Sequence, residues 1–178
     1  MRSSHPAPPP APARRAIRAA VLLVATLAAG ACGTAAARDA RPGPAAVVRT
    51  LYQHHFGAGQ NWEETYRTQR ALFAPGLAAL LDADDSASAA NRDEVVGLDF
   101  DPLTWAQDSM TAFEVLPATR DGADAIVPVV VRQDTAKRTL RLRLGASANA
   151  WRVKNIHYPE GDLATLLRQL AADRAKPR

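Results

Sequence analysis

The sequence predicts an α+β domain in which helices come first, an antiparallel sheet follows, and one more helix comes after the sheet. Three changes in periodicity support this class. Between residues 44 and 81, apolar side chains recur at spacings of three and four, as on one face of a helix. From residue 112 onward the spacing falls towards two, which is typical of half-buried strands. After residue 162, a stripe of leucines returns to the helical spacing.

The predicted helices begin and end at recognisable residues. Pro44 suits the first turn of the first helix, which is expected to end before Gly57. Pro75 opens the third helix in the same way. The small and acidic residues at 82–91 are expected to form a loop or a frayed helix end. The three helices before the sheet are expected at residues 44–56, 62–73 and 76–81.

Four predicted strands form an antiparallel meander with one face on the helices and the other in water. The Asp121-Gly122 pair is typical of a hairpin turn, and Pro128 predicts an edge strand or a bulge. Asp162 is expected to cap the final helix. The four strands are expected at residues 113–118, 125–132, 139–144 and 151–158.

Residues 1–31 resemble the signal peptide of a bacterial lipoprotein. Arginines precede an apolar run that is too short to span a bilayer, and Ala29-Gly30-Ala31-Cys32 resembles a lipobox in which Ala29 replaces the usual leucine. The resemblance implies cleavage before Cys32, followed by attachment of diacylglycerol and an acyl chain such as palmitate. The alternative is an ordinary signal peptide cleaved near Ala29 or Ala31, which leaves a soluble periplasmic protein.

The rest of the chain is expected to be a flexible lipid-anchored tether at residues 32–43 and a single domain at 44–178. Gly33 after the cysteine favours the outer membrane, with the domain facing the periplasm. Four of the 22 basic residues precede Cys32, so the remaining 18 balance the 18 acidic residues. This balance argues against nucleic acid as a partner. A chain with one cysteine forms no internal disulfide.

Three short motifs support a family resemblance. They are Asp99-Phe100-Asp101-Pro102-Leu103-Thr104-Trp105-Ala106-Gln107-Asp108, Trp151-Arg152-Val153-Lys154-Asn155-Ile156-His157-Tyr158 and Gly161-Asp162-Leu163. With the surrounding segment, residues 47–170, they resemble the bacterial family called domain of unknown function 3828. That resemblance implies a periplasmic protein or lipoprotein with a helix-backed, curved sheet, similar to nuclear transport factor 2 or to a cystatin. It implies no established activity.

The most distinctive polar residues, Asp99, Asp101, Gln107 and Asp108, lie just before the first strand. Paired carboxylates serve in acid–base catalysis or bind cations, but at this place they equally cap a turn and satisfy backbone donors. His55 shares the apolar stripe of the first helix. We expect it to be a core histidine with a satisfied hydrogen bond.

Two metal sites are weak alternatives. Residues 82–94 have the spacing of a calcium loop, but Ala87 stands where such a loop needs glycine. His55 and His157 would bind zinc only with a carboxylate as a third ligand. We therefore predict no metal and no cofactor.

A basic patch is expected on the sheet if the strand register places Arg141, Arg143, Arg152 and Lys154 on one face. Such a patch is a candidate contact for anionic lipid heads or peptidoglycan carboxylates. The alternative is the solvated outer face that any one-sided sheet needs.

These features favour a lipid-anchored, non-enzymatic domain that binds a periplasmic protein or an envelope glycan in the concavity between sheet and helices. The sequence has no phosphate-binding glycine loop, no G-x-S-x-G and no H-E-x-x-H. Two alternatives stay open. One is an immunity or inhibitor protein against a toxin or a lysozyme. The other is an enzyme whose pocket uses Asp101, Asp108 and His55 as acid–base groups.

Overall fold

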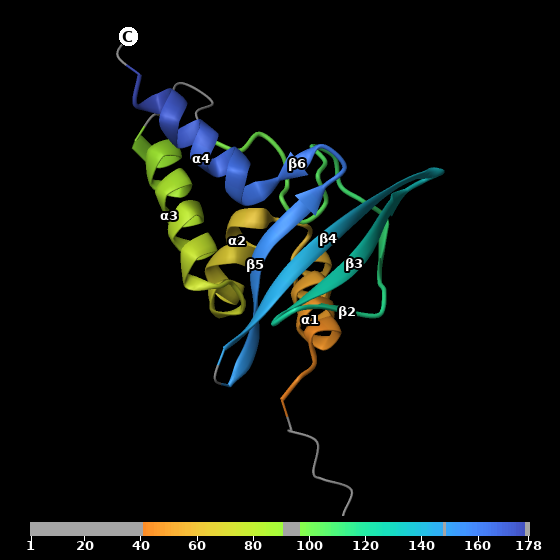
Figure 1. Ribbon diagram of the computed structural model, residues 1–178. Coiled ribbons are helices and arrows are strands. Elements are labelled where there is room, and N and C mark those ends of the chain that lie inside the picture. Colours follow the sequence, from red (N-terminus) through yellow and green to blue (C-terminus); the bar gives the residue numbers. More distant parts are fainter. Residues whose placement is uncertain (1–40, 91–96, 148, 177–178) are drawn as a thin grey trace, which may run out of the picture. The chain divides into compact units, whose positions relative to one another are not determined.

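The computed structural model describes residues 41–90, 97–147 and 149–176, which belong to one compact unit. These residues form four α-helices, one 3₁₀ helix and six strands (Figure 1), so the α+β class is confirmed. The predicted signal peptide, Cys32 and the predicted tether as far as residue 40 lie outside the described residues. In the described ranges, no helix combines the length and apolar character needed to cross a membrane.

The second predicted helix is shorter than expected. The helices are α1 (Pro44–Gly57), α2 (Trp62–Gln69), α3 (Pro75–Ala90) and α4 (Leu163–Arg174), with a 3₁₀ helix, η1 (Arg70–Leu72), after α2. The predicted helix at 62–73 is interrupted because Phe73 is extended and forms a parallel bridge with Val153 of the sheet. The N–H of Ala74 also donates to the Val153 carbonyl, at 2.8 Å. Contact with the sheet thus replaces the last helical turn.

The acidic stretch after Leu81 is helical as far as Ala90, so the predicted loop or frayed end is wrong. Its carboxylates have partners elsewhere in the fold. Asp82 accepts a hydrogen bond from Nε of Arg70 at 3.2 Å, and the buried Asp84 accepts one from Arg174 at 2.7 Å. These tertiary contacts extend α3 past the point where composition alone predicts its end.

The sheet has six strands rather than the four predicted. They are β1 (Ala112–Val115), β2 (Thr119–Asp121), β3 (Asp124–Gln133), β4 (Ala136–Ser147), β5 (Ala150–Tyr158) and β6 (Gly161–Asp162). Their order is β1-β3-β4-β5-β6, with β2 also paired to β3, and every pair is antiparallel. The two extra strands, β2 and β6, are too short to show a period in the sequence. A hairpin lies close to the predicted place, but Asp121 belongs to β2 and pairs with Asp124, so Gly122 and Ala123 form the turn that joins β2 to β3.

Pro128 lies in the interior strand β3, which has β4 on one side and both β1 and β2 on the other. Its carbonyl accepts from the N–H of Leu116 at 3.0 Å, so its nitrogen faces the same side, at the gap between β1 and β2. The missing N–H therefore leaves no ladder hydrogen bond unmade. Pro128 predicted an edge strand or a bulge, but β3 is an interior strand. The gap between β1 and β2 accommodates the proline instead.

A bulge in β5 interrupts the alternation expected along this strand. Arg143 pairs with Asn155, whereas Leu144 pairs with Val153, so Lys154 is the extra residue. The bulge places both Val153 and Ile156 in the core, three residues apart.

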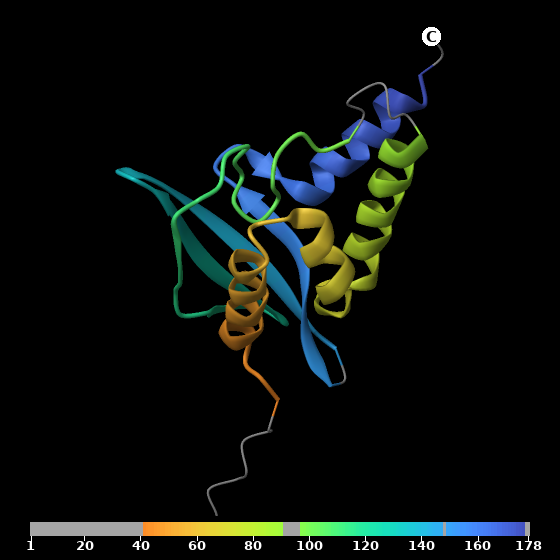
Figure 2. The same ribbon diagram turned by 180° about the vertical axis from the view of Figure 1, so that it is seen from behind.

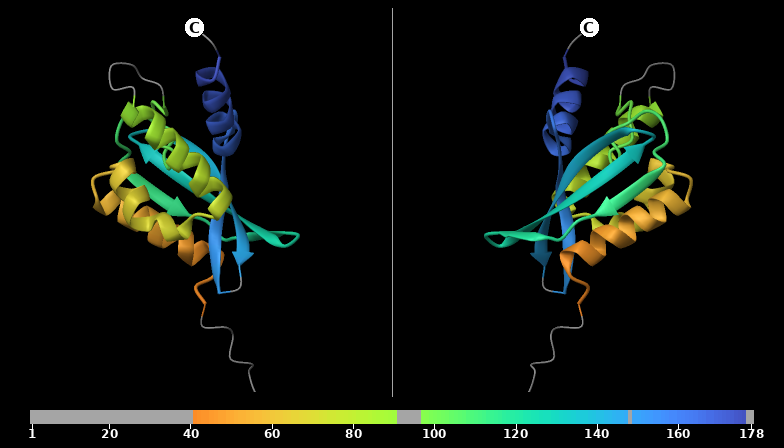
Figure 3. Two further views of the ribbon diagram at one scale, coloured as in Figure 1. Left: turned by 90° about the vertical axis from the view of Figure 1, so that its left-hand side faces the viewer. Right: turned by 90° about the vertical axis from the view of Figure 1, so that its right-hand side faces the viewer.

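The helices α1, α2 and α3 lie on the same side of the sheet, and Figures 2 and 3 show α1 along this face. The opposite face has no helix over it in the described part of the chain, and its residues Thr139 and Arg141 are exposed. The predicted one-sided packing is therefore confirmed. The largest fully buried apolar side chains in the core are Leu51, Tyr52, Phe73, Leu81, Leu103, Leu140, Leu142, Leu144, Ile156, Leu163 and Leu167.

The last helix, α4, is fixed to the sheet at its first turn. Asp162 caps it as predicted, because its side chain accepts from the N–H of Thr165 at 2.9 Å. Asn155 of β5 donates to the Asp162 carboxylate at 2.7 Å and accepts from the N–H of Ala164 at 3.0 Å. Gly161, with φ of 103°, makes the turn that allows this arrangement.

Candidate functional site

Asp101 organises a tight turn just before the sheet. Its backbone N–H donates to the carbonyl of Ala106 at 2.9 Å, and its carbonyl accepts from the N–H of Trp105 at 2.7 Å. Its Oδ1 also accepts from the N–H of Leu103 at 2.8 Å. Trp105 adopts a left-handed backbone conformation, with φ of 52°, which these hydrogen bonds hold in place.

His55 joins this turn to two helices. Its Nε2 lies 2.6 Å from Oδ2 of Asp101, and its Nδ1 lies 3.0 Å from the hydroxyl of Thr65 on α2. Because a carboxylate only accepts, Nε2 donates to Asp101, and in the tautomer with its proton on Nε2 the ring accepts from Thr65 through Nδ1. His55 and Thr65 are fully buried, whereas the Asp101 side chain is 15% exposed.

The order of groups is that of a hydroxyl, an imidazole and a carboxylate, but the arrangement is unsuited to nucleophilic catalysis. A nucleophile must reach a substrate, and the Thr65 hydroxyl is sealed inside the fold. Both nitrogens of His55 are engaged by protein groups, so the ring has no free position from which to accept a substrate proton. His55 is a buried, hydrogen-bonded core histidine, as the sequence predicted.

Two buried tyrosines hold the same turn from the other side. Tyr52 donates to the carbonyl of Leu103 at 2.6 Å, and Tyr158 donates to that of Pro102 at 3.1 Å. Burial, followed by the nearby charge of Asp101, raises the pKa of both hydroxyls, which therefore stay protonated as donors. The ring of Trp105 stacks on Tyr158 with centroids 5.8 Å apart.

Two clefts lie beside α2 and share four lining residues, and the smaller of the two adjoins this turn. The larger has a volume of about 730 Å³ and lies between α2, α3 and Leu98. The smaller, about 450 Å³, lies between the start of α2 and residues 98–107. We call the pair the Trp62 clefts, because Trp62 is the aromatic residue that borders both. The shared lining residues are Asn61, Trp62, Glu63 and Leu98.

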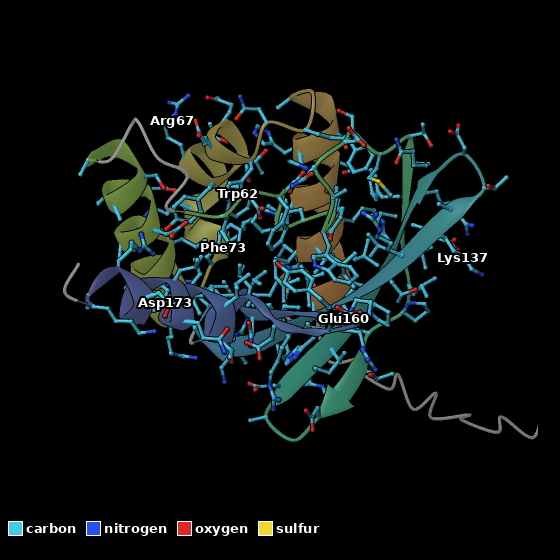
Figure 4. All side chains as sticks on the ribbon, turned by 90° about the horizontal axis from the view of Figure 1, so that it is seen from above. Trp62, Arg67, Phe73, Lys137, Glu160 and Asp173 are labelled. Carbon is cyan, nitrogen blue, oxygen red and sulfur yellow. The ribbon has the colours of Figure 1, made fainter. Side chains whose placement is uncertain are left out.

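Trp62 is held in a fixed orientation at the first turn of α2. It is half-buried, stacks on Tyr66 at 5.5 Å and meets Phe73 edge-on at 5.9 Å. Figure 4 shows Trp62 and Phe73 close together beside α2. Asn61 caps this helix by accepting from the N–H of Glu64 at 2.9 Å, which fixes the position of Trp62 in the shared wall.

Acidic residues outnumber basic residues in the walls of the Trp62 clefts. The larger cleft has five carboxylates in its lining and two arginines. Asp82 is paired with Arg70 and accepts from the Tyr66 hydroxyl, and these contacts lower the pKa of Asp82. Asp85 has no such partner, so partial burial and then the neighbouring carboxylates, Asp84 first, raise its pKa. A positively charged group would therefore be favoured in this cleft.

Of the polar residues predicted before the first strand, three border the smaller cleft. Asp99, Asp101 and Gln107 line it together, although Asp101 is already engaged by His55. Asp108 is exposed and lines neither cleft. The structure thus supports the capping role for Asp101 and does not bring Asp108 into a common pocket with His55.

Two of the four residues of the predicted basic patch, Arg143 and Lys154, are neutralised by ion pairs. Arg143 donates to Asp124 at 2.7 Å, and Lys154 donates to the same carboxylate at 3.0 Å. These hydrogen bonds lower the pKa of Asp124. Arg141 lies on the same outer face opposite His157, and Arg152 lies opposite Gly145 near the end of the sheet. Neither Arg141 nor Arg152 has an ion-pair partner in the described residues.

No group of three or more metal-binding side chains is found among the described residues. The stretch from Asp82 to Ala90, weighed as part of a calcium loop, is helical, and the later residues Asp93 and Glu94 lie outside the described residues. His55 is engaged by Thr65 and Asp101 rather than by His157.

The cleft residues could hardly be recognised from the sequence. Asn61 and Glu64 have the spacing of a helix cap, which identifies the start of α2 but not a cleft. Asp82 and Asp85 lie in the stretch predicted as a loop. Comparison of the sequence with protein-family models and with curated proteins gives no match. The resemblance to the domain of unknown function 3828 stays a prediction from short motifs.

Proposed function

We propose that this protein is a lipid-anchored domain of the bacterial cell envelope that binds a periplasmic protein through the Trp62 clefts. The lipobox-like segment before Cys32 supports the anchor. The family resemblance, with its curved sheet similar to that of nuclear transport factor 2, supports the same compartment. The outer membrane and a soluble periplasmic form remain the two locations to distinguish.

The observation that carries the binding role is the pair of adjoining clefts with an oriented aromatic residue in their shared wall. Trp62 keeps part of its ring accessible while Tyr66 and Phe73 fix its orientation. Such anchored aromatic side chains contribute strongly to protein recognition because little conformational entropy is lost on binding. The lining of the clefts comes from α2, α3 and residues 98–107 and includes no residue of strands β1 to β6, so they differ from the sheet–helix concavity considered from the sequence.

The negative charge of the larger cleft favours some of the candidate partners over others. Carboxylates outnumber arginines in the larger cleft, so a basic protein segment is favoured over the carboxylate-rich peptides of peptidoglycan. An inhibitor of a basic toxin or lysozyme is a special case of this proposal. The enzymatic alternative has less support, because His55 is sealed and Asp108 lies outside both clefts.

The test is crosslinking in cells followed by mass spectrometry, comparing the full-length tagged protein with charge-reversal variants. Glu63→Lys and Asp85→Lys change cleft carboxylates that have no hydrogen bond or ion pair in the described residues, so both variants are expected to fold. Glu160→Lys is the matched control, since Glu160 is exposed on the β5–β6 turn, away from Trp62 (Figure 4).

We expect one envelope protein to be captured by the wild type and by Glu160→Lys, and to be lost from the two cleft variants. Equal capture by all four proteins would refute the role of the clefts. Cys32→Ala separately tests the anchor, because loss of lipid labelling and of membrane fractionation is expected from that change alone.

A further inference from the structure

We propose that the end of the domain around Trp151 docks on the anionic phospholipid surface to which the tether holds it. This inference rests on the proposed lipid anchor. It adds that the domain has a preferred orientation on the membrane, with the Trp62 clefts turned away from the lipid.

Three structural elements meet at this end. Helix α1 begins here at Pro44, directly after the predicted tether, and the β4–β5 hairpin lies at the same end in Figures 1 and 3. The β2–β3 turn is close as well, because Asp124 pairs with Gly145 shortly before that hairpin. The Trp62 clefts begin beyond the opposite end of α1, which at about 1.5 Å per residue is roughly 20 Å long.

Trp151 is placed next to the hairpin and is half-buried. The guanidinium of Arg120 lies 4.9 Å from the centre of its ring. Trp151 packs against the edge of the hydrophobic core, whereas Arg152, the next residue, lies on the opposite, outer face of β5 and has a buried Nε without a hydrogen-bond partner. Tryptophan and arginine together are favoured at the headgroup level of a bilayer, where the indole meets the interface and the guanidinium meets phosphate.

The local charge fits an anionic surface. This end has four basic side chains, Arg120, Arg143, Arg152 and Lys154, against the two acidic side chains of Asp121 and Asp124. The acidic pair is already bound by Arg143 and Lys154, so the charges of Arg120 and Arg152 have no acidic partner among the described residues. The segment that carries α2, α3 and the cleft residues has the opposite balance, with eight acidic and two basic residues in the described parts of 62–108.

The tether makes even a weak contact effective. If residues 33–43 form the tether predicted from their composition, a chain of that length spans about 18 Å, which lets the anchored domain reach the lipid surface. Attachment converts docking into an intramolecular step with a local concentration on the order of millimolar. Basic side chains near an anionic surface are attracted within about one Debye length, so docking should weaken at high salt.

The experiment uses the full-length protein, extracted from membranes with its lipid and reconstituted into vesicles that contain brominated acyl chains. Vesicles of phosphatidylcholine alone are compared with vesicles that also contain phosphatidylglycerol. Tryptophan emission is measured for the wild type and for Trp151→Phe, so the difference reports Trp151. We expect emission loss and a blue shift for the wild type in anionic vesicles only, and neither effect for Trp151→Phe.

Charge variants provide the second arm. Arg120→Glu and Arg152→Glu are expected to lose the quenching, whereas Arg168→Glu on α4 is the matched control and should keep it. Protein that floats with vesicles but shows no Trp151 quenching overturns the docking inference and leaves the anchor intact. Equal quenching in neutral vesicles, or in the two charge variants, overturns it as well. Protein that floats with no vesicles refutes the anchor itself.

Discussion

Replacing Asp101 by alanine should lower the free energy of unfolding by about 3 kcal/mol. The change removes the acceptor for the Leu103 N–H and leaves Nε2 of the fully buried His55 without a partner. A buried polar group left unsatisfied costs about 1–3 kcal/mol, and there are two here. Two such groups together would cost about 2–6 kcal/mol. We expect a value in the lower part of this summed range because Asp101 is 15% exposed, which lets water reach the vacated space.

Asp101→Asn separates the two contributions. The amide oxygen of asparagine still accepts from Leu103, and its NH₂ group donates to Nε2 if His55 adopts the other neutral tautomer. The ring then donates from Nδ1 to the hydroxyl of Thr65, 3.0 Å away. Only the charge of the carboxylate is lost, so we expect a cost of about 1 kcal/mol.

Urea unfolding followed by tryptophan fluorescence measures both costs, because Trp105 belongs to the same turn. Asp99→Ala is the matched control. Asp99 is exposed and has no hydrogen bond in the described structure, so its loss should change stability by less than about 0.5 kcal/mol. If Asp101→Ala costs no more than this control, the turn is not held by the His55 contact and our reasoning is wrong.

Three further predictions use the same measurement. Hydrogen bonds from Arg143 and Lys154 lower the folded-state pKa of Asp124. Its contribution to stability is therefore complete above the unfolded pKa of about 3.9 and disappears as the pH falls through the folded pKa. The difference in unfolding free energy between the wild type and Asp124→Asn should follow that course, and a pH-independent difference would contradict it. Gly161→Ala should cost about 1 kcal/mol or more because φ is 103°, whereas Gly76→Ala in helix α3 should be neutral or stabilising; similar effects at both sites would be inconsistent with strain. Arg174→Ala should cost about 3 kcal/mol by leaving the buried Asp84 without its ion-pair partner, and a loss below about 1 kcal/mol would show that water replaces the arginine.

Much of the fold was predictable because the spacing of apolar residues within each of its longest elements indicates a helix or a strand. Helix α1 follows the spacing of its apolar residues, and β4 follows the alternation of leucine with arginine and threonine. The end of α2 and the full length of α3 were not predictable, because they depend on contacts with distant residues. Phe73 leaves the helix to meet Val153, and Asp84 stays helical beside Arg174.

The site was less accessible to prediction than the fold. His55 and Asp101 were each singled out, but they are separated by 46 residues and no local pattern indicates that they meet. The Trp62 clefts arise where α2, α3 and the segment at Leu98 come together, so no single stretch of sequence contains them. The same is true of the bulge at Lys154, which exists only relative to its partner strand.

The position of Pro128 also protects the chain against a folding error. Strand β3 has apolar side chains on both faces, with Ile126 and Val130 beside Pro128 on the outer one, so a shift by one residue would cost it only part of its hydrophobic burial. Such a shift would turn the proline nitrogen towards β4, where a hydrogen-bond donor is needed and none exists. The misaligned hairpin would be penalised as soon as it formed. Pro128 thus favours the native register of β3, because only in that register does its nitrogen face the gap between β1 and β2, where no hydrogen-bond donor is needed.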